Sequence, residues 1–162
     1  MLEPDILLCD IITHELEIDD DRVVVYNQDW NPPKDDELYI VVSTRSTKPL
    51  HVSSRYDDST DEEVMYTVSY DNLDIDITSK NREAIDRKEE VLMALTSFYS
   101  REQQELNSVK IFRTGNILDL SFIEAASAMH RFRIPVIMSN IKEKRKESPY
   151  YDKFRNEGLI ER

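Results

Sequence analysis

The spacing of apolar residues predicts two helices in this chain. Apolar side chains recur every three or four positions over residues 4–18, which is typical of an amphipathic helix, and Pro4 suits its first turn. A second set with the same spacing runs from Ala84 to Tyr99 and on towards Leu106. Side chains that commonly cap helices precede this second set, namely Thr78, Ser79 and Asn81.

Strands are predicted where apolar and polar residues alternate or where a short apolar run occurs. These segments are 23–26, 38–42 with a continuation at 50–52, 64–70, 73–77, 109–113, 117–122 and 129–138. The apolar positions change phase between Tyr70 and Leu73, so we expect a bulge near Asp71 and Asn72. Pro135 cannot donate a backbone hydrogen bond, which predicts that the last strand lies at a sheet edge there.

The order of these elements predicts the fold class. A helix, several strands, a second helix and further strands indicate an α+β fold: a mostly antiparallel β-sheet with two helices packed on one face. We expect one domain over residues 1–140. Residues 141–162 are rich in charge, have no periodic apolar face and bear three aromatic residues, so we expect an extended C-terminal arm.

Composition adds a strong and uneven acidic charge. The 162 residues include 33 Asp and Glu against 21 Lys and Arg, a formal net charge of −12. Residues 1–76 carry a net −15, residues 77–140 a net +1 and residues 141–162 a net +2. This balance disfavours wrapping of duplex DNA, because neutralisation of phosphates supplies most of that affinity.

Several classes of protein are disfavoured by what the sequence lacks. Two glycines, Gly115 and Gly158, are too few for a P-loop or a dinucleotide-binding fingerprint. Cys9 is the only cysteine, so no intramolecular disulfide or cysteine metal cluster is possible, and we expect a reducing compartment. No apolar run has the length of a membrane span, and the acidic N-terminus is unlike a signal peptide.

The sequence contains few candidates for chemistry, and we predict no catalytic, cofactor-binding or metal-binding residue. Asp74 and Asp76 share one face of a strand, which keeps open the alternative of a carboxylate-metal hydrolase assisted by Lys80 or Lys88. A polar outer face of the strand is the favoured interpretation of these two acids. Cys9 beside Leu8 is interpreted as a buried thiol, and the isolated histidines, which lack metal-ligand spacing, are His14, His51 and His130.

Two charged clusters and one aromatic cluster remain. An acidic stretch without apolar residues is predicted to be an exposed hairpin tip, and it lacks the glycine and spacing of a calcium loop; its acids are Asp57, Asp58, Asp61, Glu62 and Glu63. Lys142, Lys144, Arg145 and Lys146 form a basic cluster that Glu143 and Glu147 interrupt, which favours pairing with an acidic surface over nucleic-acid binding. The arm also holds Tyr150, Tyr151 and Phe154, aromatic residues of the kind that anchor interfaces.

This order of elements resembles the tail-terminator and head-to-tail joining (neck) proteins of tailed bacteriophages. The strand 64–70, its extension 73–77 and the helix that starts directly at Asn81-Arg82-Glu83-Ala84 carry the resemblance. The second half is similar too, with a short strand at 109–111, a segment at 116–120 and a closing strand through Arg131-Phe132-Arg133. The resemblance covers residues 4–140 and rests on element order and apolar pattern.

The resemblance implies a structural virion protein without enzymatic activity, assembled in the cytoplasm of the bacterial host. Its subunits form a homo-oligomeric ring, commonly a hexamer, between the tail tube protein and the connector on the portal side of the head. DNA passes through the ring without sequence-specific binding, and six copies together carry about −72, which repels phosphate. Under this hypothesis the acidic hairpin borders the lumen and the aromatic arm docks on a neighbouring subunit. An acidic adaptor or inhibitor that binds a basic partner is the alternative from another class.

Overall fold

The computed structural model describes residues 2–26, 29–124 and 127–148. The elements follow one another as α1 (Pro4–Leu16), a 3-10 turn (Asp20–Arg22), β1 (Val23–Val25), β2 (Tyr39–Asp57), β3 (Glu62–Ser79), α2 (Glu83–Leu95), α3 (Phe98–Leu106), β4 (Val109–Thr114), β5 (Leu118–Asp119), β6 (Phe122–Glu124) and β7 (Ser127–Glu147). The predicted α+β class is confirmed. Among the described residues, no helix has the length and apolar character needed to cross a membrane.

The strands form one mixed, mostly antiparallel sheet with the order β1-β2-β3-β7-β4, and β5 and β6 also pair with β7. β1 is parallel to β2, with Val23 opposite Ile40, whereas β4, β5 and β6 run antiparallel to β7. Strands β2, β3 and β7 are much longer than predicted. The two apolar runs predicted at 38–42 and 50–52 are joined in one strand, β2, which begins at Tyr39 and continues through Pro49 without a break.

The chain divides into two compact units. The first unit contains residues 1–48 and 70–140, and the second contains residues 49–69 and the chain from residue 141 on. Strands β2, β3 and β7 each contribute one segment to each unit. The first unit therefore ends at residue 140, and residues 49–69, which the sequence placed in one domain with it, fall in the second.

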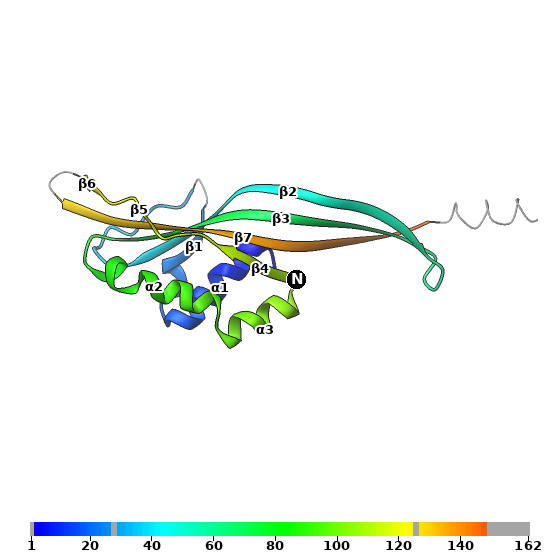
Figure 1. Cartoon of the computed structure of the whole chain (residues 1–162), viewed down its shortest axis with the longest axis horizontal. Coiled ribbons are helices and arrows are strands. Elements are labelled where there is room, and N and C mark those ends of the chain that lie inside the picture. The colour runs from blue at the N-terminus through cyan, green and yellow to red at the C-terminus, as the bar shows by residue number, and fades with distance from the viewer. Residues whose placement is uncertain (1, 27–28, 125–126, 149–162) are drawn as a thin grey trace, which may run out of the picture. The chain divides into compact units, whose positions relative to one another are not determined.

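The core of the first unit lies between its sheet and the three helices, which gather on one face of that sheet (Figure 1). Helix α1 supplies the most deeply buried apolar side chains, and its central residues Leu7, Leu8, Ile11 and Ile12 are fully buried. The sheet meets them with alternate residues of its central strands, among them Ile75 of β3 and Ile134 of β7. Because β3 and β7 pack against this core on one face, the core also fixes the positions of the side chains on the opposite face of these two strands.

The long second helix predicted from the sequence is two helices in the structure. Ser97 separates them: its backbone is extended, and its hydroxyl oxygen accepts a hydrogen bond from the amide of Ser100, which caps α3. The predicted caps at the start of α2 are confirmed for two residues. Ser79 Oγ accepts from the amide of Ala84, and Asn81 Oδ1 accepts from the amide of Glu83.

Ser69, Asp71 and Leu73 of β3 are all buried, so two polar residues share the buried side of the strand with the apolar set that starts at Leu73. The bulge near Asp71 and Asn72 stays a prediction. The prediction of a sheet edge at Pro135 was wrong, because β3 lies on one side of β7 and β4 on the other. The carbonyl of Pro135 accepts a hydrogen bond from the amide of Gly115, just past the end of β4. Proline is tolerated here because its position on β7 lies between the stretches that pair with β4 and with β5.

The second unit has almost no apolar core of its own. In its described residues Val64 is the single hydrophobic side chain that is fully buried, while Leu50, Val52 and Ile141 are exposed. Three strands with so little buried apolar surface are marginally stable in water. This unit therefore belongs to the part of the protein that opens most easily.

We expect hydrogen exchange to separate the two units. Amides of residues 50–57, 62–69 and 141–147 should exchange at least about 100-fold faster than those of 73–77 and 136–138, because local opening of the second unit exposes little apolar surface. Mass spectrometry of the native protein after timed deuterium labelling measures both rates. Equal protection of the two sets of amides would contradict this account.

Candidate functional site

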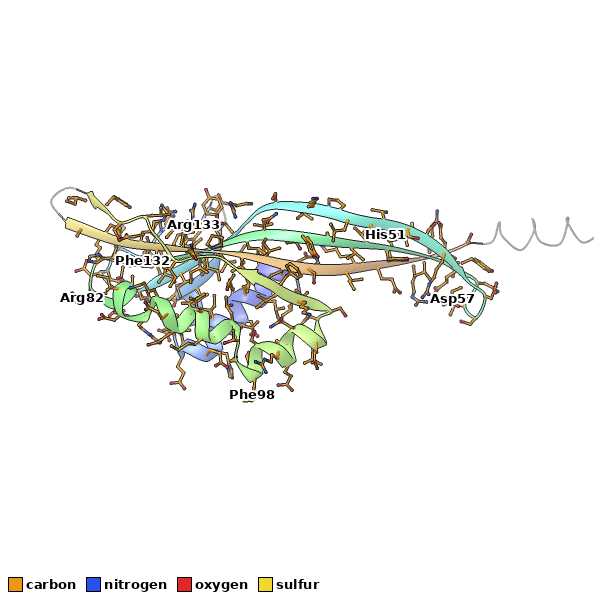
Figure 2. All side chains as sticks on the ribbon, viewed as in Figure 1. His51, Asp57, Arg82, Phe98, Phe132 and Arg133 are labelled. Carbon is orange, nitrogen blue, oxygen red and sulfur yellow. The ribbon has the colours of Figure 1, made fainter. Side chains whose placement is uncertain are left out.

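The face of the first unit's sheet that lies opposite the helices carries a cluster of buried ions. Leu73, Ile75 and Ile77 of β3 point into the helical core, so Asp74 and Asp76 between them point to the other face. On β7 the neighbours Phe132 and Arg133 point to opposite sides in the same way (Figure 2). Strand alternation therefore sends acids from β3 and arginines from β7 to one surface.

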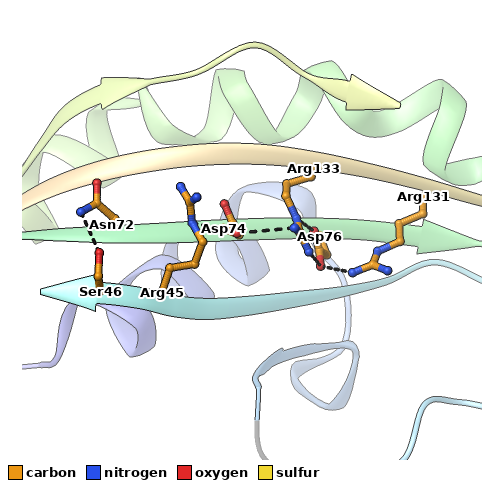
Figure 3. Close-up of polar contacts among 7 residues, drawn as sticks. All are labelled: Arg45, Ser46, Asn72, Asp74, Asp76, Arg131 and Arg133. Atoms are coloured by element: carbon orange, nitrogen blue, oxygen red, sulfur yellow. Dashed lines mark hydrogen bonds and ion pairs between the residues drawn. The ribbon is translucent and has the colours of Figure 1, made fainter. Parts of the chain in front are cut away.

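Three arginines hold the two acids. Arg133 binds Asp76 through two bonds, from Nε to Oδ1 at 2.7 Å and from Nη2 to Oδ2 at 2.8 Å, and Arg131 Nη2 donates to the same Oδ2 at 2.7 Å (Figure 3). Asp74 Oδ2 lies 3.0 Å from Arg45 Nε on β2 and 3.7 Å from Arg133 Nη1. We call these five residues the ion-pair ladder; it spans β2, β3 and β7 and has a formal charge of +1.

Burial and the neighbouring arginines shift the pKa of Asp76 in opposite directions. Asp74 is 2% exposed and Asp76 9% exposed. Burial opposes ionisation of Asp76, but its hydrogen bonds from Arg133 and Arg131 outweigh that effect and hold the pKa of the carboxyl below its ordinary value. The bond to Asp76 in turn raises the pKa of Arg133. Asp74 Oδ1 is buried and accepts no hydrogen bond from the described residues.

Asp74 and Asp76 share the face of β3 opposite the helical core, as the sequence predicted, but arginines cover both acids, which the sequence analysis did not predict. The two lysines named in the hydrolase alternative have other surroundings. Lys80 is exposed, and Lys88 Nζ lies over the ring of Phe132, which points into the helical core. In the described part of the chain, no group of three or more acids, histidines or cysteines is arranged to hold a metal ion.

An aromatic pocket adjoins the ladder in the first unit and has a volume of about 190 Å³. Its lining residues come from β2, β3, β6 and β7, together with Tyr26 and Trp30, which follow β1. The rings of Trp30 and Tyr39 lie 5.5 Å apart at a tilt of 55°. The lining residues are Tyr26, Trp30, Tyr39, Val41, Asp76, Thr78, Phe122, Met129 and Arg131.

The ladder and the pocket share two residues, Asp76 and Arg131. The pocket is therefore apolar and aromatic over most of its wall and has a paired cation at one side. Such a surface suits a ligand that combines an apolar ring with an acidic group. The sequence analysis did not find this site, since its aromatic residues come from segments about a hundred positions apart.

The acidic hairpin predicted from the sequence lies in the second unit, where residues 58–61 form the exposed turn between β2 and β3. Its charge is partly paired within the chain, because Arg145 Nη1 lies 3.4 Å from both Asp57 and Glu62. Hydrogen bonds from the hydroxyl and amide of Ser59 lower the pKa of Asp57, and Arg145 adds to this effect. The hydroxyl of Tyr56 donates to Asp61 at 2.7 Å.

The structure describes the basic cluster but not the aromatic residues of the predicted arm. Residues 141–147 continue strand β7, so the arm predicted from residue 141 begins as sheet, and Arg145 of this cluster pairs with the acidic hairpin. Glu143 also binds Arg145, at 2.7 Å. Tyr150, Tyr151 and Phe154 lie outside the described residues.

Cys9 is largely buried, and two of the three histidines lie beside aromatic rings. Burial, with a smaller effect of Asp5, raises the pKa of the Cys9 thiol to about 12, so the thiol is almost entirely protonated at neutral pH. His14 stacks on Tyr99 at 3.7 Å between ring centres, and His51 lies beside Tyr66 at 5.6 Å. His130 is half-buried at the start of β7.

A scan against protein-family models and a search of curated proteins found no match to this chain.

Proposed function

We propose that this protein is a structural subunit of a ring at the head-tail junction of a tailed bacteriophage. The observation that carries the proposal is the amount of apolar surface left open in the first unit. Of its exposed large hydrophobic side chains, two groups share neighbouring elements: Met93, Phe98 and Leu106 on α2 and α3, and Leu118, Leu120, Phe122 and Ile123 around β5 and β6. Apolar surface that is left open to this extent marks sites of protein association.

Phe98 is the clearest case. It is 88% exposed at the first position of α3 and points away from the helices (Figure 2). Arg101 lies near its ring, at 5.7 Å from the ring centre, and no other aromatic ring stacks on it among the described residues. An aromatic side chain held by a capped helix yet exposed to water is a typical interface anchor.

The two apolar groups favour a ring over a two-fold dimer. They differ in residues and in secondary structure, and they lie on different parts of the first unit (Figure 1). A contact between two unlike surfaces is head-to-tail, and repeated head-to-tail contacts close into a ring when the rotation allows it. The resemblance to tail-terminator and neck proteins supports a ring of about six subunits, with the tail tube protein and the head connector as partners.

The charge of the chain suits a channel for DNA. With −12 per subunit, a ring repels phosphate and lets a duplex slide. Asp58 and Asp61 remain at the exposed turn of the hairpin, while Arg145 offsets part of the charge of Asp57 and Glu62. We therefore assign the border of the lumen to the hairpin turn.

Substitution of Phe98 tests the association surface. We expect Phe98→Asp to weaken subunit association at least about 30-fold, because an interface anchor contributes about 2 kcal/mol or more. Sedimentation velocity across a concentration series measures the change. Lys80→Asp, at another exposed position, is the matched control and should leave association unchanged. Equal association of wild-type chain and Phe98→Asp would remove the α2–α3 side from the interface.

A further inference from the structure

The aromatic pocket has the size of one aromatic side chain. Its volume is about 190 Å³, and a cavity of about 150 Å³ is enough to bind benzene. The rings of Trp30 and Tyr39 lie next to each other in its lining, and Tyr26 and Phe122, which also line it, are exposed to solvent. The pocket therefore fits a ring inserted from outside the first unit.

The charge beside the pocket indicates which kind of residue should lie close to the inserted ring. The ion-pair ladder has three arginines and two acids, and Arg131 is the arginine that lines the pocket. One of its Nη atoms binds Asp76, and its side chain is still 37% exposed. A guanidinium that is partly open to solvent recognises a carboxylate through parallel hydrogen bonds.

The chain itself carries a segment with this chemistry, within the fourteen residues that follow Ser148. Pro149 is followed by Tyr150, Tyr151 and Asp152. In an extended segment, residues two positions apart point to the same side. Tyr150 and Asp152 can therefore face one surface together, the ring towards the pocket and the carboxylate towards Arg131.

We propose that the aromatic pocket receives Tyr150 from the C-terminal segment of a second copy of this chain, with Asp152 bound to Arg131. This inference rests on the proposed ring and names the contact that links neighbouring subunits. We assign the donor to a second copy because a head-to-tail contact joins one part of a subunit to a different part of its neighbour, here the C-terminal segment to the aromatic pocket. The acid Asp152 complements the partly exposed Arg131 that lines this pocket.

Disulfide trapping in the full-length protein tests the contact. Tyr150→Cys combined with Met129→Cys places one thiol on the segment and one in the pocket wall. Cys9 stays in place, since its thiol is largely protonated at pH 8. Tyr150→Cys with Asp20→Cys is the control, because Asp20 is exposed in the 3-10 turn and belongs neither to the pocket lining nor to the two apolar groups of the proposed association surface.

We expect mild oxidation to join chains through the 129–150 pair at least 10-fold more than through the 20–150 pair. Non-reducing gels show this as dimers and higher multimers. Equal yields, or a disulfide within one chain only, overturn the proposal. Light scattering of the same samples separates this failure from that of the proposed function: a ring without the 129–150 disulfide overturns the contact alone, and absence of a ring overturns both.

Tryptophan fluorescence gives a second readout that does not depend on new cysteines. Trp30 is the only tryptophan and lines the pocket. We expect Tyr150→Ala with Asp152→Ala to shift its emission to longer wavelength, because Trp30 loses the ring that covers it. Tyr151→Ala, which changes a side chain on the opposite side of an extended segment, should leave the emission unchanged. Identical emission in wild-type chain and double variant overturns the proposal.

Discussion

Asp76→Ala is expected to lower the free energy of unfolding by about 3–4 kcal/mol at pH 7, because it leaves Arg131 and Arg133 with no carboxylate in contact at hydrogen-bond distance. The remaining acid, Asp74, is 3.7 Å from Arg133 and already pairs with Arg45. Urea unfolding followed by circular dichroism measures the change. Asp86→Ala is the matched control: Asp86 forms an exposed ion pair with Arg82, and its loss should cost less than about 0.5 kcal/mol.

The same ion-pair ladder predicts a dependence on pH. The pKa of Asp76 is lower in the folded protein than its ordinary value, so the unfolded chain binds a proton first as the pH falls. The contribution of Asp76 to stability is therefore complete above its unfolded pKa of about 4 and is lost as the pH falls through the folded pKa. We expect the stability difference between wild-type chain and Asp76→Asn to be largest at pH 7 and to shrink below about pH 4. A constant difference from pH 7 to pH 3 would contradict the assigned role of Asp76.

Ile75→Ala is expected to destabilise the protein by about 3–4 kcal/mol, mainly through the cavity that it leaves. Ile75 is fully buried between the sheet and the helices, and it lies between Asp74 and Asp76 on β3. Ile123→Ala is the matched comparison: Ile123 is 81% exposed in the single subunit, so at protein concentrations too low for association its removal should change stability by no more than about 0.5 kcal/mol. Thermal unfolding of the three proteins at low concentration measures both effects. A similar loss in both variants under this condition would mean that the core is placed wrongly.

Comparison of the two variants at higher protein concentrations tests the proposed contact at Ile123. If Ile123 is covered by a neighbouring subunit, the loss caused by Ile123→Ala depends on concentration, because association contributes to apparent stability. The loss caused by Ile75→Ala does not, since Ile75 lies inside the first unit. The pair of substitutions thus also reports on the β5–β6 side of the proposed interface.

Local patterns were sufficient to predict the fold class. Helix α1 and the strand residues 73–77 follow directly from apolar spacing, and the caps Ser79 and Asn81 follow from residue type. The break at Ser97 also had a local signal, since serine is a common N-cap. The sequence interpretation missed it because the apolar face of α2 continues across the break into α3, so periodicity alone did not show where one helix ends.

The candidate site depends on contacts that no local pattern specifies. Asp76 and Arg131 are 55 positions apart, and they meet only because β3 and β7 are neighbours in the sheet. The sequence did contain one signal: Arg131 and Arg133 on β7 alternate with apolar residues at the same two-residue spacing as Asp74 and Asp76 on β3. The aromatic pocket had no such signal, because it joins Trp30, Tyr39 and Phe122 from three separate segments.

The central claim of this account is that the protein assembles into a closed ring. The most direct test is the mass of the full-length protein by light scattering over a concentration series, with negative-stain images of the same fractions. We predict a single assembly of about six subunits, near six times 19.1 kDa, with a central hole. A monomer mass at every concentration, or a compact dimer with two-fold symmetry, would contradict the account.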